Sequence, residues 1–306
     1  MTHGKRGFAS SVVSYPERGP FGDSRYRGNT TGHIVADFLA TFHGRDASAL
    51  FIDPAEGSGT SGDVAKALGI RYEGRDLRRG FNLLRDDLAS SLGEEAQTAW
   101  FHPPYAGMIA YSGNVWGSQQ HEDDLSAPGE DIPLFLEMMQ AALQNIYRAL
   151  RPGGTYGVLL GSWRKNGRYH HLPALILPVA PGALQGEIIK VQHNCTSDRT
   201  AYAGRFVPIA HETLLVFRRE ADGTAFALLG DAFERLAAYS RMTARNAVRS
   251  AFRAGEALTL DALYARLETH PRMRSIPTWK AKVRQVVQDA RTFERVAKGR
   301  YQLAAA

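Results

Sequence analysis

The sequence contains little cysteine and no long apolar run. Its 306 residues include a single cysteine, Cys195, which excludes a disulfide framework, and no CxxC or clustered His/Cys pattern indicates zinc. No apolar run approaches the ~18 residues of a membrane span, and residues 1–7 do not lead into the apolar stretch of a secretory signal. We therefore expect a cytoplasmic protein that binds no metal and no membrane.

Charge is unevenly distributed along the chain. The 37 Lys and Arg residues exceed the 31 Asp and Glu residues, which gives a net charge of +6. Residues 241–306 hold fourteen basic and five acidic residues, a net of +9, so the remainder of the chain carries −3. A basic segment of this kind is typical of a module that meets a polyanion, although a solvated Arg-rich helical surface has the same composition.

Apolar patterning predicts an α/β fold for most of the chain. Residues spaced as on one helical face alternate with short apolar runs that are typical of buried strands. The expected helices are 34–42, 63–68 and 132–150, and the expected strands are 49–52, 70–76, 99–101, 155–160, 187–192 and 211–218. Because strands alternate with helices, we expect a largely parallel, Rossmann-like sheet that ends in an antiparallel strand pair.

The basic C-terminal part has a different pattern. Helical spacing over 243–253, 258–268 and 278–290 is followed by a hairpin pattern over 293–303, with Gly299 at its turn. Three helices followed by a basic hairpin are the order of elements in a winged helix. We therefore expect two domains, 1–225 and 240–306, with the boundary near 222–242.

A glycine-rich turn follows the apolar strand at 49–52. Residues 53–62 read DPAEGSGTSG and run into the next expected helix. Glycines there allow the backbone to pass close to a ligand, and the start of a helix offers free N–H groups. The turn is neither GxGxxG nor a phosphate loop, since no Lys-Ser/Thr pair follows it. Taken alone, it is equally well explained as a tight turn.

The sequence His102-Pro103-Pro104-Tyr105 follows a later strand. Two consecutive prolines remove two N–H donors and fix the backbone, which leaves the carbonyls of His102 and Pro103 directed out of the sheet edge. Such carbonyls can accept hydrogen bonds from an exocyclic amine, and Tyr105 offers a face on which a base could stack. A rigid loop after a strand is the plain alternative.

The two motifs lie 49 residues apart, and together they resemble the S-adenosylmethionine-dependent DNA amino-methyltransferases. The resemblance spans residues 14–218, and its opening at 14–27 is similar to that of enzymes from phage and mobile elements. It implies a Rossmann-like methyltransferase domain in which the turn at 53–62 binds the methionine part of the cofactor. It also implies that the catalytic residues, which grip the amino group of adenine or cytosine, are His102, Pro103, Pro104 and Tyr105.

The same resemblance implies a set of cofactor-binding residues. They are Tyr26, Gly28, Asn29, Thr30, Asp53, Pro54, Gly57, Ser58, Gly59, Thr60, Asp76, Asp86 and His102. Among them, Asp76 is expected at the ribose diol and Asp86, or its neighbour Asp87, at the cofactor adenine. Position 102 departs from the family, which usually has Asp or Asn for adenine N6 and often Ser for cytosine N4. A neutral His nitrogen can also accept an amine hydrogen, so activity is compatible with His102. The rest of the sequence resembles the adenine enzymes more closely, which favours adenine N6, with cytosine N4 as the alternative.

Basic and aromatic side chains are candidates for DNA contact. The full set is Trp116, Arg164, Lys165, Arg168, Lys280, Lys282, Arg284, Lys298 and Arg300. Trp116 lies in the polar stretch 111–126, which is equally well explained as a solvated linker. Arg164, Lys165 and Arg168 follow the strand at 155–160, and their clustering favours contact with DNA phosphate over an exposed basic loop. Those from residue 280 onward lie on the third helix and the hairpin of the basic module, where they could read guanine edges or bind phosphates. Glu212, at the start of the last strand, is expected to be structural.

These features predict a site-specific methyltransferase that acts on adenine N6 in double-stranded DNA, by base flipping and direct transfer from S-adenosylmethionine. Cytosine C5 chemistry is not expected, because Cys195 does not follow a proline. The resemblance and the symmetry of DNA sites favour a homodimer in the bacterial cytoplasm or nucleoid, either as an orphan methylase or in a restriction–modification system. The alternatives are an RNA or protein-amide methyltransferase, which the winged helix disfavours, and a non-catalytic DNA-binding regulator, which the intact motifs disfavour.

Overall fold

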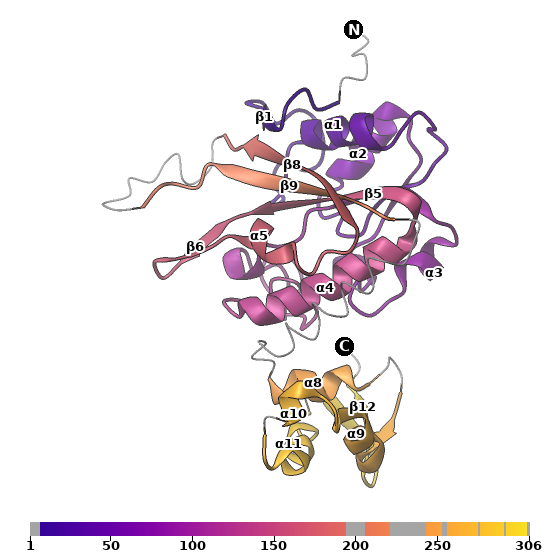
Figure 1. The fold of residues 1–306 in the computed structure, drawn as a ribbon, viewed down its shortest axis with the longest axis vertical. Helices are drawn as coiled ribbons and strands as arrows, with labels where there is room; N and C mark the ends of the chain where they lie inside the picture. Colours follow the sequence, from indigo (N-terminus) through magenta and orange to yellow (C-terminus); the bar gives the residue numbers. More distant parts are fainter. Residues whose placement is uncertain are drawn as a thin grey trace. The chain divides into compact units, whose positions relative to one another are not determined.

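The structure is a computed structural model that describes residues 7–193, 206–220, 243–252, 256–274, 276–290 and 292–304. The chain divides into two compact units, Met1–Leu229 and Gly230–Ala306 (Figure 1). Cys195 and the whole of the expected boundary at 222–242 lie outside the described residues.

The first unit is built on a seven-stranded mixed sheet with the order β1-β8-β9-β5-β4-β2-β3. Its strands are β1 (Val12–Ser14), β2 (Phe51–Asp53), β3 (Tyr72–Gly74), β4 (Ala96–Phe101), β5 (Leu150–Gly161), β8 (Ala183–Val191) and β9 (His211–Arg218). Strands β3, β2, β4 and β5 are parallel, whereas β9 is antiparallel to both of its neighbours, β5 and β8. The predicted α/β sheet with a closing antiparallel pair is confirmed. Strand β1, which pairs with β8 in parallel, was not predicted, because three largely exposed residues carry little apolar signal.

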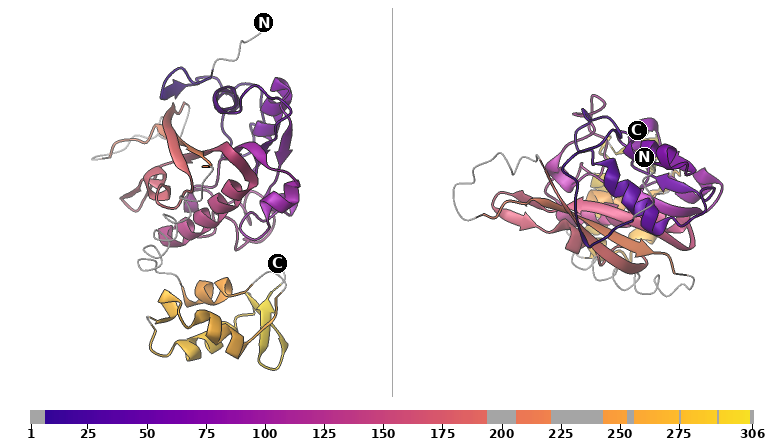
Figure 2. Two further views of the ribbon diagram at one scale, coloured as in Figure 1. Left: turned by 45° about the vertical axis from the view of Figure 1, so that its right-hand side comes forward. Right: turned by 90° about the horizontal axis from the view of Figure 1, so that it is seen from above.

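Helices cover both faces of this sheet (Figures 1 and 2). Helices α1 (Gly32–Phe42) and α2 (Thr60–Leu68) lie on one face, and α4 (Ile132–Ala149) and α5 (Leu172–Ile176) lie on the other. The short helix α3 (Leu88–Leu92) packs beside α4. Helix α4 begins where the side chain of Asp131 accepts a hydrogen bond from the Leu134 amide at 3.1 Å.

The apolar core beneath α1 and α2 sets the position of the strand ends. Phe38 packs against Trp100 with ring centroids 5.4 Å apart, and Gly157 leaves the space that the Phe38 ring occupies. Val64 and Leu159 belong to the same buried cluster. Burial of each such side chain stabilises the fold by about 1.5–3 kcal/mol, so the helices and strands are held in a fixed register.

A basic hairpin follows β5. Its strands are β6 (Trp163–Lys165) and β7 (Arg168–His170), and both turn residues, Asn166 and Gly167, have positive φ angles of 49° and 76°. An Asn-Gly pair favours such a two-residue turn. The basic residues Lys165 and Arg168 beside the turn are exposed, so DNA contact at this hairpin stays a prediction, with an exposed basic loop as its alternative.

The second unit contains helices and a small sheet. Its elements are α8 (Ala244–Ser250), β10 (Leu258–Thr259), α9 (Leu260–Leu267), α10 (Pro271–Arg274), α11 (Trp279–Val286), β11 (Phe293–Ala297) and β12 (Arg300–Leu303). The expected helices at 243–253, 258–268 and 278–290 correspond to α8, α9 and α11, which are shorter, and the hairpin forms at β11 and β12. Strand β10, which was not predicted, adds to β12 and completes a three-stranded sheet. A separate apolar cluster that includes Val248, Leu263 and Val283 holds these elements together.

Candidate functional site

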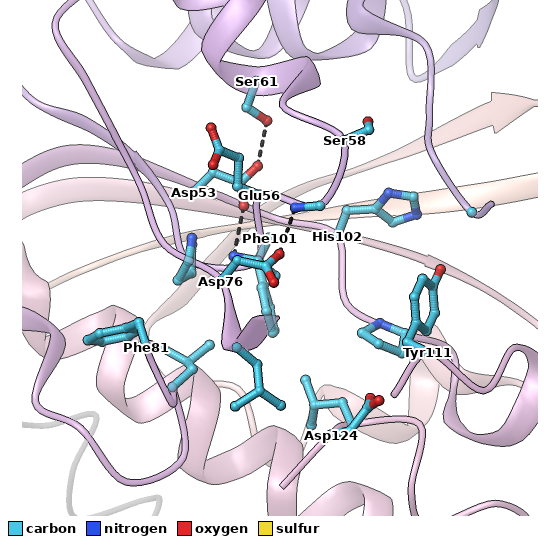
Figure 3. A pocket seen from close by; sticks show the side chains of 18 of the residues that line it. Asp53, Glu56, Ser58, Ser61, Asp76, Phe81, Phe101, His102, Tyr111 and Asp124 are labelled. Atoms are coloured by element: carbon cyan, nitrogen blue, oxygen red, sulfur yellow. Dashed lines mark hydrogen bonds between the residues drawn. The ribbon is translucent and has the colours of Figure 1, made fainter. Parts of the chain in front are cut away.

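A cavity opens at the carboxyl ends of β2, β3 and β4, where ligands bind in open parallel sheets (Figure 3). It brings together most of the residues that the two sequence motifs single out. The predicted site residues that line it are Tyr26, Gly28, Asn29, Thr30, Asp53, Pro54, Gly57, Ser58, Thr60, Asp76, His102, Pro104 and Trp116. Of the residues predicted to be catalytic or to bind the cofactor, four do not line it, namely Gly59, Asp86, Pro103 and Tyr105.

The turn after β2 is organised around Asp53. The buried carboxylate accepts hydrogen bonds from the Ala55 amide at 3.0 Å and from the Ser61 hydroxyl at 2.6 Å (Figure 3). Burial raises the pKa of Asp53 to about 7. Gly57 and Gly59 have φ angles of 52° and 82°, a region that favours glycine, and no side chain caps the start of α2. Gly59 therefore shapes the turn without facing the cavity.

Asp76 ties the end of β3 to that turn. Its Oδ2 accepts a hydrogen bond from the Gly57 amide at 2.8 Å, and its Oδ1 accepts one from the Arg78 amide at 2.9 Å. The Arg78 guanidinium lies over the ring of Tyr26, 5.3 Å from its centroid, and donates to the Gly57 carbonyl at 2.6 Å. The glycine turn, the acidic strand end and the segment before α1 thus form one wall of the cavity.

Gly28 and Thr30, in the segment before α1, both line the cavity. Thr30 is 6% exposed and lines the cavity, yet its hydroxyl oxygen has no hydrogen-bond partner among the described residues. A buried hydroxyl without a partner is costly, so a polar group of a ligand would relieve it. A Cβ atom on Gly28 would lie 1.9 Å from the hydroxyl oxygen of Tyr111, so only glycine fits there.

Asp86 lies apart from this wall. Its side chain is exposed and accepts a hydrogen bond from the Asn82 amide at 2.7 Å. The neighbouring Asp87 is also exposed and caps α3 through the Ser90 amide at 3.0 Å. The carboxylates that do line the cavity beyond Asp53, Glu56 and Asp76 are those of Asp123 and Asp124, which the sequence motifs do not single out.

The polar stretch at 111–126 is folded and partly buried, so the alternative of a solvated linker is wrong for its second half. Asp124 is 3% exposed and accepts hydrogen bonds from the amide and the hydroxyl of Ser112 at 2.7 and 2.6 Å. Asp123 accepts a hydrogen bond from the Asn82 side chain at 2.8 Å and pairs with Arg85. These buried contacts fold the stretch back onto the cavity, where Trp116 and Tyr111 also lie.

His102, at the end of β4, belongs to a partly buried chain of polar groups. Its Nε2 lies 2.8 Å from the hydroxyl oxygen of Tyr105, which donates to Glu212 Oε1 at 2.5 Å. Glu212 Oε2 accepts a hydrogen bond from Lys190 Nζ, also at 2.5 Å. Lys190 and Glu212 face each other as a cross-strand pair on β8 and β9, so strand register brings them to the site. Glu212, which the sequence leads us to expect as a structural residue, thus contacts both Tyr105 and Lys190.

Burial and charge set the protonation of this chain of groups. Burial lowers the pKa of His102 to about 4, so the ring is neutral near pH 7. Burial also acts to raise the pKa of Glu212, but the Lys190 ammonium and the neighbouring hydrogen bonds outweigh it and lower that pKa to about 2. The chain thus consists of a neutral imidazole, a phenol, a carboxylate and an ammonium group.

The ring of Tyr105 packs on β5 rather than facing the cavity. A Cβ atom on Gly161 would lie 2.8 Å from Tyr105 Cε2, so the ring fills the space that this glycine leaves. The expected stacking of a base on Tyr105 stays a prediction. The aromatic side chains that line the cavity with His102 are Tyr26, Phe81, Trp100, Phe101, Tyr111 and Trp116.

The predicted DNA contacts lie on the surfaces of the two units. On the β6–β7 hairpin, the Arg164 guanidinium lies over the rings of Tyr169 and Phe206, at 5.4 and 4.6 Å from their centroids. Lys165 lies 3.9 Å from Glu130 Oε1, and Arg168 is exposed.

In the second unit, the predicted contacts lie on α11 and the β11–β12 hairpin. Lys280 and Arg284 are exposed on α11, Lys282 is half-buried there, and Lys298 and Arg300 are exposed on the hairpin. Lys280 Nζ lies 5.4 Å from the centroid of the Tyr264 ring, whose hydroxyl oxygen accepts a hydrogen bond from Arg284 at 3.3 Å.

The described residues hold no group of three or more His, Cys, Asp or Glu side chains that could bind a metal ion. None of the helices in the described ranges is long and apolar enough to cross a membrane.

Comparison with known proteins gives likeness of structure only. No protein-family model matches the sequence, and no curated protein matches it either. Among solved structures, a candidate DNA modification methylase of Thermus thermophilus in complex with S-adenosyl-L-methionine is 20% identical, with a TM-score of 0.29 over 45% of this chain and 53% of the other. TrmN from Thermus thermophilus is 15% identical, with a TM-score of 0.34 over 64% and 51%. An rRNA methylase from Streptococcus thermophilus is 11% identical, with a TM-score of 0.32 over 61% and 96%. This chain thus spans about half the length of the first two.

Proposed function

We propose that this protein is a methyltransferase that transfers a methyl group from S-adenosylmethionine to an exocyclic amine of double-stranded DNA, with adenine N6 as the target. One observation carries the proposal. The glycine turn after β2, the carboxylate of Asp76 and the strand end at His102 and Pro104 all line a single cavity. A cofactor bound by the first two features therefore lies beside the third.

The residues of the cavity fit the proposed cofactor. Asp76 is held by two backbone amides and presents a carboxylate, a suitable acceptor for a ribose diol. The hydroxyl of Thr30 lacks a partner among the described residues, and the turn at Gly57 offers backbone that a ligand can approach closely. The expected adenine contact at Asp86 is replaced in this proposal by the cavity residues Phe81 and Asn82, which follow Asp76 in the chain.

The strand end beyond β4 supplies the groups that hold the target amine. Bound in the cavity, S-adenosylmethionine supplies an electrophilic methyl group, whose bond to sulfur breaks as the amine nitrogen takes the methyl, with the electron pair left on sulfur. Pro103 and Pro104 carry no N–H, so this strand end offers the amine only hydrogen-bond acceptors from these two residues and no backbone donor. His102, with a pKa of about 4, orients the amine by accepting a hydrogen bond and does not act as a strong base. The methylated amine then releases one proton to solvent.

The second unit is proposed to be a winged helix that reads DNA. Helices α8, α9 and α11 with the three-stranded β10-β12-β11 sheet support this. In this arrangement α11 enters the major groove with Lys280, Lys282 and Arg284, while Lys298 and Arg300 reach the backbone. The net charge of +9 from residue 241 onward supplies the sequence-independent attraction to phosphate. A homodimer suits a two-fold symmetric DNA site, as proposed for this protein.

The decisive experiment measures which nucleoside is methylated. The full-length protein is incubated with S-adenosylmethionine carrying a labelled methyl group and with duplex DNA, RNA or protein in parallel. The products are then digested and identified by mass spectrometry. We expect label in N6-methyladenine from duplex DNA. N4-methylcytosine would move the target to the other base, label confined to RNA or protein would overturn the DNA assignment, and no transfer to any substrate would favour a non-catalytic regulator.

A further inference from the structure

The partly buried chain of hydrogen bonds from Lys190 to His102 has a direction, because the two charged groups at one end of it, Lys190 and Glu212, can each play only one part. Lys190 is an ammonium and only donates, and Glu212, which it holds at 2.5 Å, is a carboxylate and only accepts. The hydroxyl of Tyr105 lies 2.5 Å from the other oxygen of Glu212 and must therefore donate its one hydrogen there. Nothing is left on that hydroxyl to donate to His102.

The direction of the chain fixes the tautomer of His102. Its Nε2 lies 2.8 Å from Tyr105 Oη, and this short contact requires one hydrogen between the two atoms. Because the Tyr105 hydrogen is committed to Glu212, the hydrogen comes from Nε2. A neutral imidazole carries one N–H, so Nδ1 is left as a bare acceptor.

Nδ1, the nitrogen without a hydrogen, belongs to His102, which lines the cavity. His102 lines the cavity, whereas Tyr105, toward which Nε2 is directed, does not. No residue in the described part of the chain makes a hydrogen bond to Nδ1. The side chain of His102 is 15% exposed, so it is accessible to a bound group.

We infer that Glu212 is a positioning residue that acts through Tyr105 to hold His102 with its hydrogen on Nε2, so that Nδ1 faces the substrate as an acceptor for an amine hydrogen. The inference rests on the proposed function and gives it a basis for substrate choice. An acceptor at this position favours adenine N6 or cytosine N4, which carry hydrogens, and repels the O6 of guanine or the O4 of thymine. Lys190 secures the arrangement because it keeps Glu212 ionised.

A reversed chain would have the opposite effect. If Glu212 were protonated or absent, the hydroxyl of Tyr105 could donate to Nε2, and the imidazole hydrogen would move to Nδ1. That N–H would then meet the target amine as a second donor, which is repulsive. The ionisation of Glu212 on β9 therefore decides whether Nδ1 of His102 accepts a hydrogen bond from the substrate or donates one to it.

Nitrogen NMR of the full-length protein tests the tautomer without any need for activity. The protein is labelled with ¹⁵N-histidine, and the His102 signals are identified by their loss in His102→Gln. We expect the wild-type protein to carry the hydrogen on Nε2. In the double variant Glu212→Leu/Lys190→Met, which removes both charges together, and in Tyr105→Phe, we expect the hydrogen to redistribute toward Nδ1. A wild-type ring with hydrogen on Nδ1, or no change in either variant, overturns the inference.

Transfer kinetics separate the inference from the proposed function. Tyr105→Phe keeps the ring but removes the hydroxyl, and we expect kcat to fall by about tenfold or more, the loss of one hydrogen bond in the reacting state, with cofactor affinity unchanged. The matched control is Tyr15→Phe, which removes another hydroxyl that donates to a carboxylate, that of Asp37 at 2.6 Å, away from the cavity. Full activity of Tyr105→Phe in an active wild-type background overturns the inference alone. A wild-type protein with the expected tautomer but no methyl transfer to any substrate overturns the proposed function alone.

Discussion

The amide of Gly57 donates a hydrogen bond to Asp76 Oδ2 at 2.8 Å, and this bond joins the turn after β2 to the end of β3. It fixes the glycine backbone and the carboxylate relative to each other before any ligand binds. A second amide, that of Arg78, holds the other carboxylate oxygen at 2.9 Å. The carboxylate is therefore pre-oriented, and a ligand that uses it loses little further conformational freedom.

Substitution of Asp76 by Ala should weaken cofactor binding. The loss of a hydrogen bond to a charged group costs about 1.5–3 kcal/mol, which corresponds to about tenfold to a hundredfold in the dissociation constant for S-adenosylmethionine. Calorimetric titration of the full-length protein measures this constant. Glu73→Gln is the control, because Glu73 is an exposed carboxylate on the same short strand, β3. Equal affinities of Asp76→Ala and the control would remove Asp76 from the cofactor site.

Local patterns in the sequence were sufficient to predict the motif residues of the site, but they did not predict the contact that Glu212 makes with Tyr105. The turn after Asp53 and the strand end at His102 carry glycine and proline signals that can be recognised within a few residues. Glu212 carries no such signal, because it reaches Tyr105 only through the pairing of β9 with β5 and β8. Strand register depends on tertiary packing, and the sequence of one strand does not determine it.

Motif spacing led us to expect Asp86 at the cofactor site, but its side chain does not line the cavity. Asp86 has the expected separation from Asp76, but the chain between them turns so that its side chain is exposed. Conversely, Asp123 and Asp124 lie in a stretch with no apolar periodicity and are buried by local hydrogen bonds to Asn82 and Ser112. Polar burial of this kind follows from side-chain partners, which a pattern of apolar residues does not reveal.

Gly161→Ala should destabilise the first unit. The new methyl group would lie 2.8 Å from Tyr105 Cε2, and the ring cannot move freely because Glu212 holds its hydroxyl. Overpacking of this kind costs about 1–3 kcal/mol in the free energy of unfolding, which urea denaturation measures. Gly186→Ala is the control, because nothing lies within 4 Å of the new atom on β8 and its backbone needs no positive φ. There alanine should be neutral or stabilising by up to about 1 kcal/mol.

The stability of the protein should depend on His102 in mildly acidic solution. Burial lowers the pKa of His102 from 6.5 to about 4, so between these values the unfolded chain binds a proton that the folded chain does not. Stability therefore falls as pH decreases through this window, by up to about 1.4 kcal/mol per pH unit, and the full contribution is present above pH 6.5. Of the groups that face the ring, Glu212 stays ionised throughout, because its pKa is about 2, and Tyr105 keeps its proton, because burial raises its pKa well above 10.

Urea unfolding of the wild type and of His102→Gln at about pH 7, 6 and 5 isolates this contribution from those of other titrating groups. The wild type should lose stability more steeply than the variant as the pH decreases. Parallel curves for the two proteins would mean that His102 is protonated as readily in the folded as in the unfolded chain.

The cations of α11 should contribute to the salt dependence of DNA binding. Each phosphate contact that is lost lowers the slope of log affinity against log salt by about 0.9, so Lys280→Gln and Lys282→Gln should each reduce the slope by about that amount if they meet the backbone.

An Arg284→Gln variant that keeps the slope but binds different duplex sequences more equally would instead indicate contact with a base edge, at a cost of about 1–3 kcal/mol in discrimination. Arg266→Gln is the matched control, because its guanidinium already pairs with both oxygens of Glu256 at 2.7 Å and is not available to phosphate. Slopes measured by fluorescence anisotropy on the full-length protein that are the same for all four variants would place the DNA contact elsewhere on the chain.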